Sequence, residues 1–382
     1  MRLAVLALTT FVLFLSTLVG TPVIPDLAAE LGAGPGATAA ILSSALMTLV
    51  LLQFFTGGLA DRYGRRLVLG SAALAGGLTS LGCALAGDWH WLLAMRILGG
   101  VADAISMPAL LGLTAEISEG RQGTFFGVLR SAQGLSFILG PAIGGALSLA
   151  SLRAPFLVDA GLSLVACGLL VGFMPSKAVH SAERHDWAQL GRLKKLFANR
   201  RYYAFALFCG VNNVAFPVLS AFVPVKARSA GADPRQISLM LAAEAGCFAL
   251  ASWLVGRASD RWGRRPFVIA AQPGVILACI GLAVAESLPW LVAWYAVYGL
   301  AGGTTFLLGL VMAADVTPTA DTAGMLGAFD AAVDLLLFVA PAVALAAYGQ
   351  LGQVDPLILA ACLPAVLALP VALRAGETKE PG

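Results

Sequence analysis

Long apolar stretches recur along the whole chain, and each is about as long as a membrane-spanning helix. A helix needs about 20 apolar residues to cross the hydrocarbon core of a bilayer. Because lipid offers the backbone no hydrogen-bond partner, stretches of this length are helices rather than strands. They cover 3–25, 37–58, 67–86, 91–117, 125–150, 155–175, 202–225, 237–258, 267–285, 290–314, 324–348 and 356–373. The pattern predicts an all-α integral membrane protein with twelve transmembrane helices.

Basic residues gather in alternate connections between these helices. One set of connections holds Arg62, Arg65, Arg66, Arg121, the segment 176–201, Arg257, Arg261, Arg264 and Arg265. The other set holds only Arg153, Lys226, Arg228 and Arg235. Cytoplasmic loops carry the excess of Lys and Arg in membrane proteins. We therefore expect both termini in the cytoplasm of a bacterial cell, with the chain in its plasma or inner membrane.

One long connection divides the chain. Residues 176–201 join two sets of six predicted helices, 1–175 and 202–375, and 376–382 form a cytoplasmic tail. Apolar side chains recur in the connection at helical spacing, at Trp187, Leu190, Leu193, Leu196 and Phe197. With basic residues between them, this spacing favours an amphipathic helix on the inner membrane surface. A solvated linker between two bundles is the alternative.

The two sets of helices repeat each other. GGLADRYGRR at 57–66 returns as VGRASDRWGRR at 255–265, which pairs Asp61 with Asp260 at an offset of 199. Further pairs follow in the same order: Pro25 with Pro224, Glu116 with Asp315, and Pro141 with Pro341. The order indicates duplication of a six-helix unit, an architecture that recurs in transporters with a central binding site.

Composition narrows the class of protein. Only 12% of the residues are charged and 59% are hydrophobic, whereas a soluble domain is about 25% charged. The net charge of +3 is too small to indicate a nucleic-acid partner. These values exclude a disordered chain and an ordinary soluble enzyme. Motifs for a nucleophilic serine, a zinc protease or a phosphate-binding loop are also missing from the sequence, so we expect no catalytic residues, no metal and no cofactor.

The repeated turn and two further motifs resemble those of the major facilitator superfamily, over essentially the whole chain. The loop signature of that family is matched by Gly57, Leu59, Ala60, Asp61, Arg62, Gly64, Arg65 and Arg66. Its fourth-helix signature is matched by Arg96 and Gly100, with Gly99 in place of the usual Gln. Its fifth-helix signature is matched by Gly127, Gly140, Pro141, Gly144 and Gly145, with Ser136 in place of a Gly. The resemblance implies two six-helix bundles related by a pseudo-twofold axis, and the fifth-helix motif implies export by the drug:proton antiporter branch.

The turn residues themselves suggest a conformational switch. Arginines with one aspartate can bridge helix ends by charge-assisted hydrogen bonds and can interact with helix dipoles. If these contacts exist in only one state of the protein, they bias its two-state equilibrium. The alternative is that the arginines merely obey the positive-inside rule. The candidate switch residues are Gly57, Asp61, Arg62, Gly64, Arg65, Arg66, Asp260, Arg261 and Arg264. In the fifth helix, Gly140, Pro141, Gly144 and Gly145 are expected to allow close helix packing.

Charges within the apolar stretches are candidates for proton coupling, because a charge in the bilayer is costly. Asp103 lies seven residues after Arg96, on the same helix face. A gate that makes and breaks this approach could move a proton; a permanent ion pair is the alternative. Asp330 and Asp334 also share a face, and two such carboxylates can share one proton. Asp330 could instead pair with Arg130.

Polar and aromatic residues within the stretches are candidates for the substrate site. They are Asn212, Asn213, Glu244, Gln133, Phe137 and Tyr298. Helix-to-helix hydrogen bonding and packing are the alternative roles. Asp26 and Asp159 lie close to the outer ends of their helices, where we expect them to be solvated.

These features predict a proton-coupled secondary transporter that exports a small amphipathic or cationic molecule by alternating access. The proton gradient is its expected energy source, and the lipid bilayer, protons and the substrate are its expected partners. An uptake symporter on the same fold is the alternative, because membrane acids couple protons in either direction. We expect a monomer.

Overall fold

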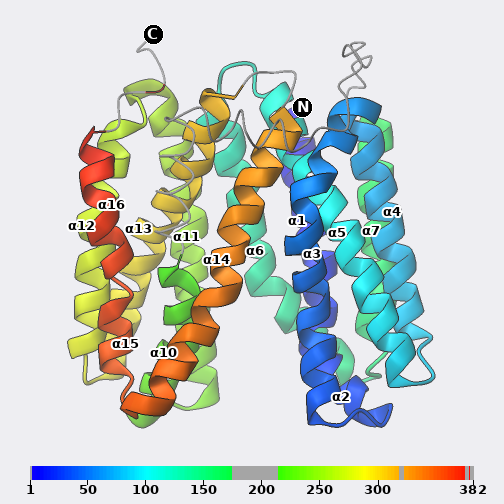
Figure 1. Cartoon of the computed structure of the whole chain (residues 1–382), viewed down its shortest axis with the longest axis horizontal. Coiled ribbons are helices and arrows are strands. Elements are labelled where there is room, and N and C mark those ends of the chain that lie inside the picture. Colours follow the sequence, from blue (N-terminus) through cyan, green and yellow to red (C-terminus); the bar gives the residue numbers. More distant parts are fainter. Residues whose placement is uncertain (1, 174–213, 318–321, 375–377, 379–382) are drawn as a thin grey trace. The chain divides into compact units, whose positions relative to one another are not determined.

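The computed structural model describes residues 2–173, 214–317, 322–374 and 378, which are helical throughout apart from short turns. The helices are α1 (Arg2–Gly20), η1 (Thr21–Val23), α2 (Ile24–Glu30), α3 (Pro35–Tyr63), α4 (Arg65–Ala84), α5 (Trp89–Ile117), α6 (Gln122–Ser148), α7 (Ala154–Phe173), α10 (Ala215–Ser229), α11 (Pro234–Trp262), α12 (Arg265–Val284), α13 (Leu288–Asp315), α14 (Thr322–Leu351), α15 (Asp355–Ala360) and α16 (Leu363–Arg374) (Figure 1).

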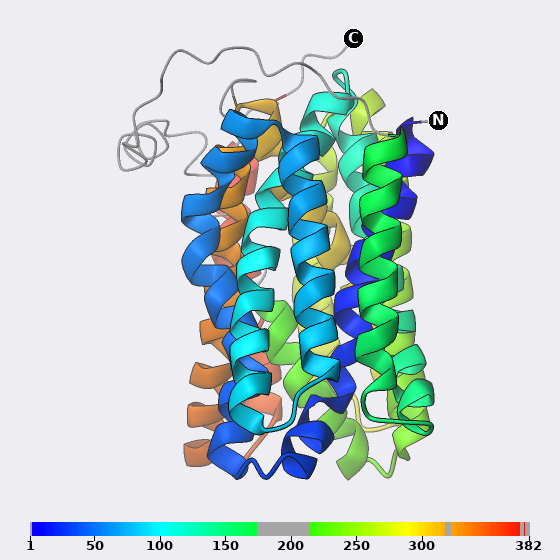
Figure 2. The same cartoon turned by 90° about the vertical axis from the view of Figure 1, so that its right-hand side faces the viewer.

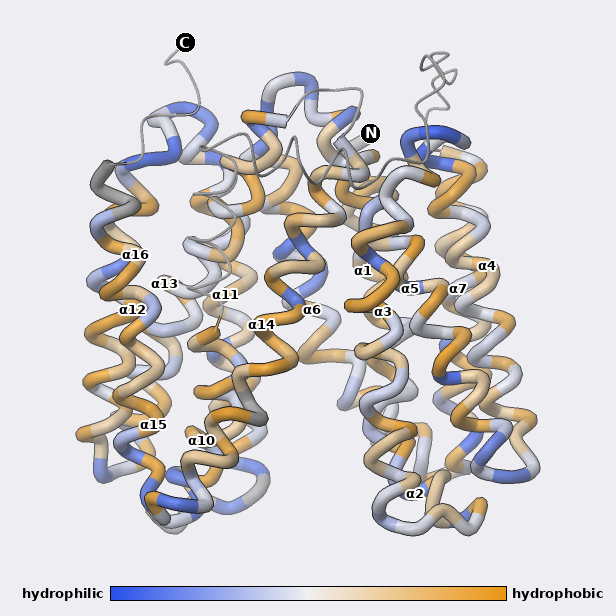
Figure 3. Tube along the Cα trace, in the orientation of Figure 1, coloured by the Kyte–Doolittle hydropathy of each residue, from blue (hydrophilic) through white to orange (hydrophobic). Residues whose placement is uncertain are grey.

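The predicted spans agree with these helices. In the described parts of the chain, nine helical stretches are long and apolar enough to cross a membrane. Of the remaining predicted spans, one corresponds to α6 and the last to the pair α15 and α16, while α10 covers only the end of 202–225, whose residues 202–213 lie outside the described residues. Most of the length of each helix is hydrophobic, and hydrophilic residues are concentrated in the turns (Figure 3). The amphipathic helix predicted within 176–201 lies outside the described residues.

The described helices belong to two compact units. Of the described residues, unit 1 comprises 2–117, 135–173 and 322–331, and unit 2 comprises 118–134, 214–317, 332–374 and 378. In unit 1, α5 packs against α3 and α4, and α7 packs against α1 and α4. Figure 2 shows α4 (light blue) and α7 (green) as long helices with nearly parallel axes, along which the chain runs in opposite directions. In unit 2, α13 packs against α11 and α12, and α12 also contacts α15 and α16.

The units do not follow the order of the chain completely. Residues 122–134, at the start of α6, belong to unit 2, whereas 322–331, at the start of α14, belong to unit 1. The two transferred segments correspond to each other in the sequence repeat, at an offset of 200. The first part of each of these helices is therefore held by helices of the other repeat.

The fifth-helix motif lies where α6 approaches α1 within unit 1. A Cβ atom on Gly140 would lie 2.5 Å from Leu18 Cβ, and one on Gly144 would collide with the Val19 carbonyl oxygen. A Cβ on Gly145 would meet no neighbour within 4 Å, and Pro141 is exposed.

The serine that departs from the motif also contacts α1. Ser136 Oγ, where the family pattern has a glycine, donates to Phe11 O at 3.0 Å. The close packing of this motif on α1 therefore rests on Gly140 and Gly144, whereas its Gly127 packs against Ser252 and Gly256 within unit 2. Ser136 adds a hydrogen bond to the same helix contact.

The adjacent glycines of α6 allow a matched test of this packing. Gly144→Ala adds a methyl group where no space exists, and such overpacking costs about 1–3 kcal/mol. Gly145→Ala adds the same group in open space and gains the helix propensity of alanine, about 0.5–1 kcal/mol. We expect the thermal unfolding midpoint of the purified protein to fall for Gly144→Ala and to stay level or rise for Gly145→Ala. Equal midpoints for the two variants would contradict the close approach of α1 and α6.

Candidate functional site

Each D-R-x-G-R-R segment forms the tight turn between two long helices. Gly64 separates α3 from α4 with φ of 93°, and Gly263 separates α11 from α12 with φ of 84°. Residues with a Cβ rarely adopt these positive φ values, so a glycine allows the turn without strain. The turn places an aspartate in the last turn of one helix and an arginine at the start of the next.

Asp61, at the end of α3, binds the first turn of α14 within unit 1. Its Oδ1 accepts from Ala323 N at 3.2 Å, and its Oδ2 accepts from Gly324 N at 2.9 Å. The first amides of a helix have no partner within the helix and carry its positive dipole end. Asp61 therefore caps the start of α14 from another helix.

Arg65 neutralises this aspartate and ties it to α5. Its guanidinium donates to Asp61 Oδ1 at 3.1 Å, to Glu116 Oε2 at 3.2 Å and to Gly112 O at 3.0 Å. We call Asp61, Arg65, Glu116 and the first turn of α14 the first clamp. Four helices, α3, α4, α5 and α14, meet in it, and Arg65 of α4 pairs with both Asp61 of α3 and Glu116 of α5.

The second repeat builds the same arrangement within unit 2. Asp260 accepts from Gly123 N at 3.0 Å and from Thr124 N at 2.6 Å, in the first turn of α6. Arg264 is fully buried and pairs with Asp260 at 2.8 Å and with Asp315 at 3.1 Å. We call Asp260, Arg264, Asp315 and the first turn of α6 the second clamp.

Glycines bring the helices of each clamp close together. A Cβ on Gly57 would lie 2.6 Å from Gly324 Cα, so α3 and α14 touch backbone to backbone. Gly256, the repeat equivalent of Gly57, lies in the same way against Gly123 and Gly127 of α6. The aspartates can reach the helix amides because no side chain stands between the backbones.

The other predicted switch residues lie around the clamps. Arg62 is exposed and stacks over the ring of Tyr63 at 5.2 Å. Arg66 donates to the carbonyl of Val171 in α7. Arg261 is exposed at the end of α11. The structure thus brings Asp61 with Arg65 and Asp260 with Arg264 into the clamps, and leaves the neighbouring arginines on the outside.

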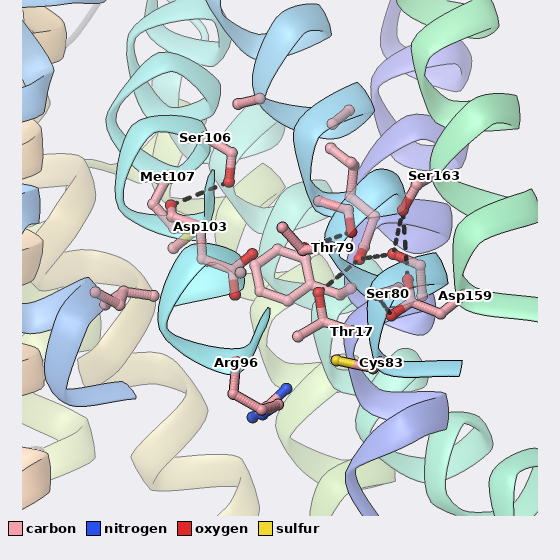
Figure 4. Close-up of a pocket in the computed structure, with 18 of the residues that line it drawn as sticks. Thr17, Thr79, Ser80, Cys83, Arg96, Asp103, Ser106, Met107, Asp159 and Ser163 are labelled. Atoms are coloured by element: carbon pink, nitrogen blue, oxygen red, sulfur yellow. Dashed lines mark hydrogen bonds between the residues drawn. The ribbon is translucent and has the colours of Figure 1, made fainter. Parts of the chain in front are cut away.

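A cavity of about 150 Å³ lies inside unit 1, between α1, α3, α4, α5 and α7 (Figure 4). Arg96 and Asp103, both predicted from the fourth-helix charges, line it. Asp159 of α7 lines it as well and is only 8% exposed. We expected Asp159 to be solvated near the outer end of its helix; that expectation is wrong, because the side chain faces the bundle interior.

Two other predicted acids lie on α14. Asp330 is buried and accepts from Gln53 Nε2 of α3 at 3.1 Å, within unit 1. Asp334 is half-buried and belongs to unit 2. Arg130, also in unit 2, is buried, donates to Gln133 Oε1 at 2.7 Å and stacks over the Phe306 ring at 4.2 Å.

The predicted substrate residues fall into different parts of the chain. Glu244 of α11 and Tyr298 of α13 are both buried in unit 2, where Gly299 brings α13 against the backbone of Glu244. Gln133 is half-buried in unit 2, and Phe137 is exposed in unit 1. Asn212 and Asn213 lie outside the described residues.

Comparison with known proteins identifies the family. The sequence pattern of the Major Facilitator Superfamily matches residues 6–228 and 214–382. The chain belongs to the Major Facilitator Superfamily. Its fold is that of a solved superfamily structure, described as the human organic anion transporter MFSD10 (TETRAN), with a TM-score of 0.81 over 97% of this chain and 98% of that one at 17% identity. As a member of the superfamily, the protein is a multi-pass membrane transporter and not an enzyme.

Two bacterial superfamily members are similar in sequence over part of their length. Quinolone resistance protein NorA of Staphylococcus aureus is 28% identical over 166 residues, which are 43% of each chain. Multidrug resistance protein 1 of Bacillus subtilis is 25% identical over 206 residues, 54% of this chain and 53% of that protein. The matched part therefore spans about half the length of these curated relatives.

Amide hydrogen exchange measures the strength of the hydrogen bonds that the helix amides donate to Asp61 and Asp260. Hydrogen bonds to a charged group contribute about 1.5–3 kcal/mol, which corresponds to about 10- to 100-fold in an opening equilibrium. We expect Asp61→Asn to speed exchange of the Ala323 and Gly324 amides by such a factor. Asp260→Asn should do the same at Gly123 and Thr124.

Each of these variants is the control for the other. Asp61→Asn should leave the first turn of α6 unchanged, and Asp260→Asn should leave the first turn of α14 unchanged. Faster exchange at both turns in both variants would indicate general destabilisation and would refute separate clamps.

Proposed function

We propose that this superfamily member is an exporter that exchanges a small amphipathic or cationic molecule for protons by alternating access. The observation that carries the proposal is the pair of buried clamps, each an aspartate that caps the start of a helix from the other repeat. Similarity to proteins named for quinolone and multidrug resistance supports export as the direction and drug-like molecules as the substrate class.

The clamps are suited to a conformational switch because each consists of a few polar groups that bind one another at one helix end. Opening a clamp exposes two helix amides, one aspartate and one arginine, all of which water can solvate. Closing it pairs the same groups again, so the two states differ by a small free energy. A transporter needs two states of similar free energy, since its substrate and protons can shift the balance only by their own differential affinity.

Proton coupling is assigned in this proposal to Asp103 with Arg96, and to Asp330 and Asp334 on α14. A carboxylate within the membrane-spanning region is costly unless it is paired or protonated. Asp103 and Arg96 line one cavity, so a change in their approach would change whether Asp103 holds a proton. The proton gradient supplies the energy, and we propose that no cofactor takes part.

The substrate is assigned to the residues that the sequence predicted. Glu244 would attract a cationic group, while Tyr298, Gln133 and Phe137 would supply polar and aromatic contacts, together with Asn212 and Asn213. We further propose that the protein works as a monomer in a bacterial inner membrane, with both termini in the cytoplasm.

Everted membrane vesicles test the direction of transport and its coupling. Their outer face is the cytoplasmic face, so an exporter accumulates substrate in an acidified lumen. We expect wild-type vesicles to accumulate ethidium, a lipophilic cation, or norfloxacin, a quinolone. We expect Asp103→Asn vesicles to lose this accumulation at wild-type levels of inserted protein.

Asp26→Asn is the matched control, because Asp26 is an exposed aspartate on α2. It should accumulate the dye as the wild type does. Coupled accumulation that persists in Asp103→Asn would remove Asp103 from the coupling mechanism. Uptake by whole cells with none by everted vesicles would show import instead of export.

A further inference from the structure

The proton-coupling assignment above does not use Asp159, although it lies in the same cavity as Arg96 and Asp103. Asp159 on α7 and Asp103 on α5 stand on opposite sides of this cavity (Figure 4). The hydroxyl groups of Thr17, Thr79 and Ser80 lie between them. The cavity therefore brings two carboxyl groups and one guanidinium together within unit 1.

The hydrogen-bond partners of Asp159 are hydroxyl groups. Ser163 Oγ donates to its Oδ1 at 3.3 Å, and Ser80 Oγ bonds to its Oδ2. Ser163 also reaches Ser16 Oγ of α1 at 3.5 Å. A hydroxyl can donate to a carboxylate or accept from a carboxylic acid, whereas a guanidinium can only donate. The surroundings of Asp159 can therefore satisfy it in both protonation states.

The cavity holds more acidic than basic side chains. Its titratable and charged lining residues are Cys83, Arg96, Asp103 and Asp159; its other polar lining residues carry only hydroxyl groups. With a neutral thiol, two carboxylates and one guanidinium leave one negative charge in a region where an unpaired charge is costly. One bound proton makes the set neutral.

The guanidinium lies on the same helix as Asp103 and outside the hydroxyl cluster of Asp159. Arg96 Nε is buried without a hydrogen-bond partner in the described part of the chain, whereas Asp159 is held by the hydroxyl groups of Ser80 and Ser163. The cavity is lined by polar groups and has room for ordered water, which can link the two carboxyl groups.

We propose that, in the conformation of this structure, the cavity stores one proton on Asp159, while Asp103 is ionised as the counter-charge of Arg96; Asp103 takes its own proton only when its approach to Arg96 changes. Asp159 is thus a second proton-carrying residue, and Ser80, Ser163 and Ser16 position it. The role of Asp159 in transport rests on the proposed export function. Its protonation in this cavity does not depend on that function.

Infrared difference spectroscopy reads the proton directly. We compare the purified full-length protein in lipid nanodiscs at neutral pH with its Asp159→Asn variant. If Asp159 holds the proton, the C=O band of a protonated carboxyl group is present in the wild type and missing from the variant, so it appears as a positive band in the wild-type minus variant spectrum. If Asp159 is ionised, the band that the variant lacks is a carboxylate band instead, and the proposal is overturned.

Further variants keep the test decisive. Asp26→Asn, an exposed aspartate, should remove a carboxylate band and leave the protonated band in place. Ser163→Ala keeps the charge count and removes one hydroxyl partner, so it should shift the protonated band without abolishing it. An unshifted band in Ser163→Ala would overturn the hydroxyl assignment, and this variant also serves if Asp159→Asn fails to fold.

A transport measurement separates the two proposals. Asp159→Asn should lose proton-driven ethidium accumulation in everted vesicles, while Asp26→Asn keeps it. A protonated Asp159 with no accumulation even in the wild type would leave the proton store standing and overturn the export function. Full wild-type accumulation in Asp159→Asn would overturn its role as a carrier.

Discussion

An aspartate that binds the free amides of another helix is the interaction on which both units of this transporter depend. The first amides of a helix have no partner inside the helix, so a helix that begins in a buried place needs an acceptor from elsewhere. Asp61 satisfies those of α14, and Asp260 satisfies those of α6. Each aspartate is in turn neutralised by an arginine four residues later. The helix end, the carboxylate and the guanidinium are thus buried together, and in the proposed mechanism they become exposed together when the clamp opens.

Most of the fold could be predicted from the sequence, because the bilayer sets one length for every apolar run. The helix ends follow from charges and glycines at the turns. The structure differs where proline interrupts a run: the first continues through a short 3-10 turn at Thr21–Val23, and the last divides between α15 and α16. Proline lacks an amide hydrogen, so it loosens a helix inside an apolar run without ending the span. The hydropathy pattern does not reveal such breaks, because the apolar run continues across them.

The charged residues of the site could be predicted where the sequence repeat pairs them. The offset of 199 paired Asp61 with Asp260 and Glu116 with Asp315, and the structure places each pair in equivalent clamps. The amide partners on α6 and α14 could not be predicted, because backbone donors leave no trace in residue type. Asp159 was misplaced for a related reason: α7 is apolar on all sides, so its sequence does not show which face turns inward.

The rate of transport, measured separately from substrate affinity, tests the claim that the clamps are conformational switches. In everted vesicles, initial rates of ethidium accumulation over a range of concentrations give the turnover and the half-saturating concentration for the wild type, Asp61→Asn and Asp260→Asn. The account predicts that turnover falls about tenfold or more in each variant, the loss of one to two charged hydrogen bonds, with the half-saturating concentration unchanged. Wild-type turnover with a raised half-saturating concentration would contradict it, because the aspartates would then act on substrate binding.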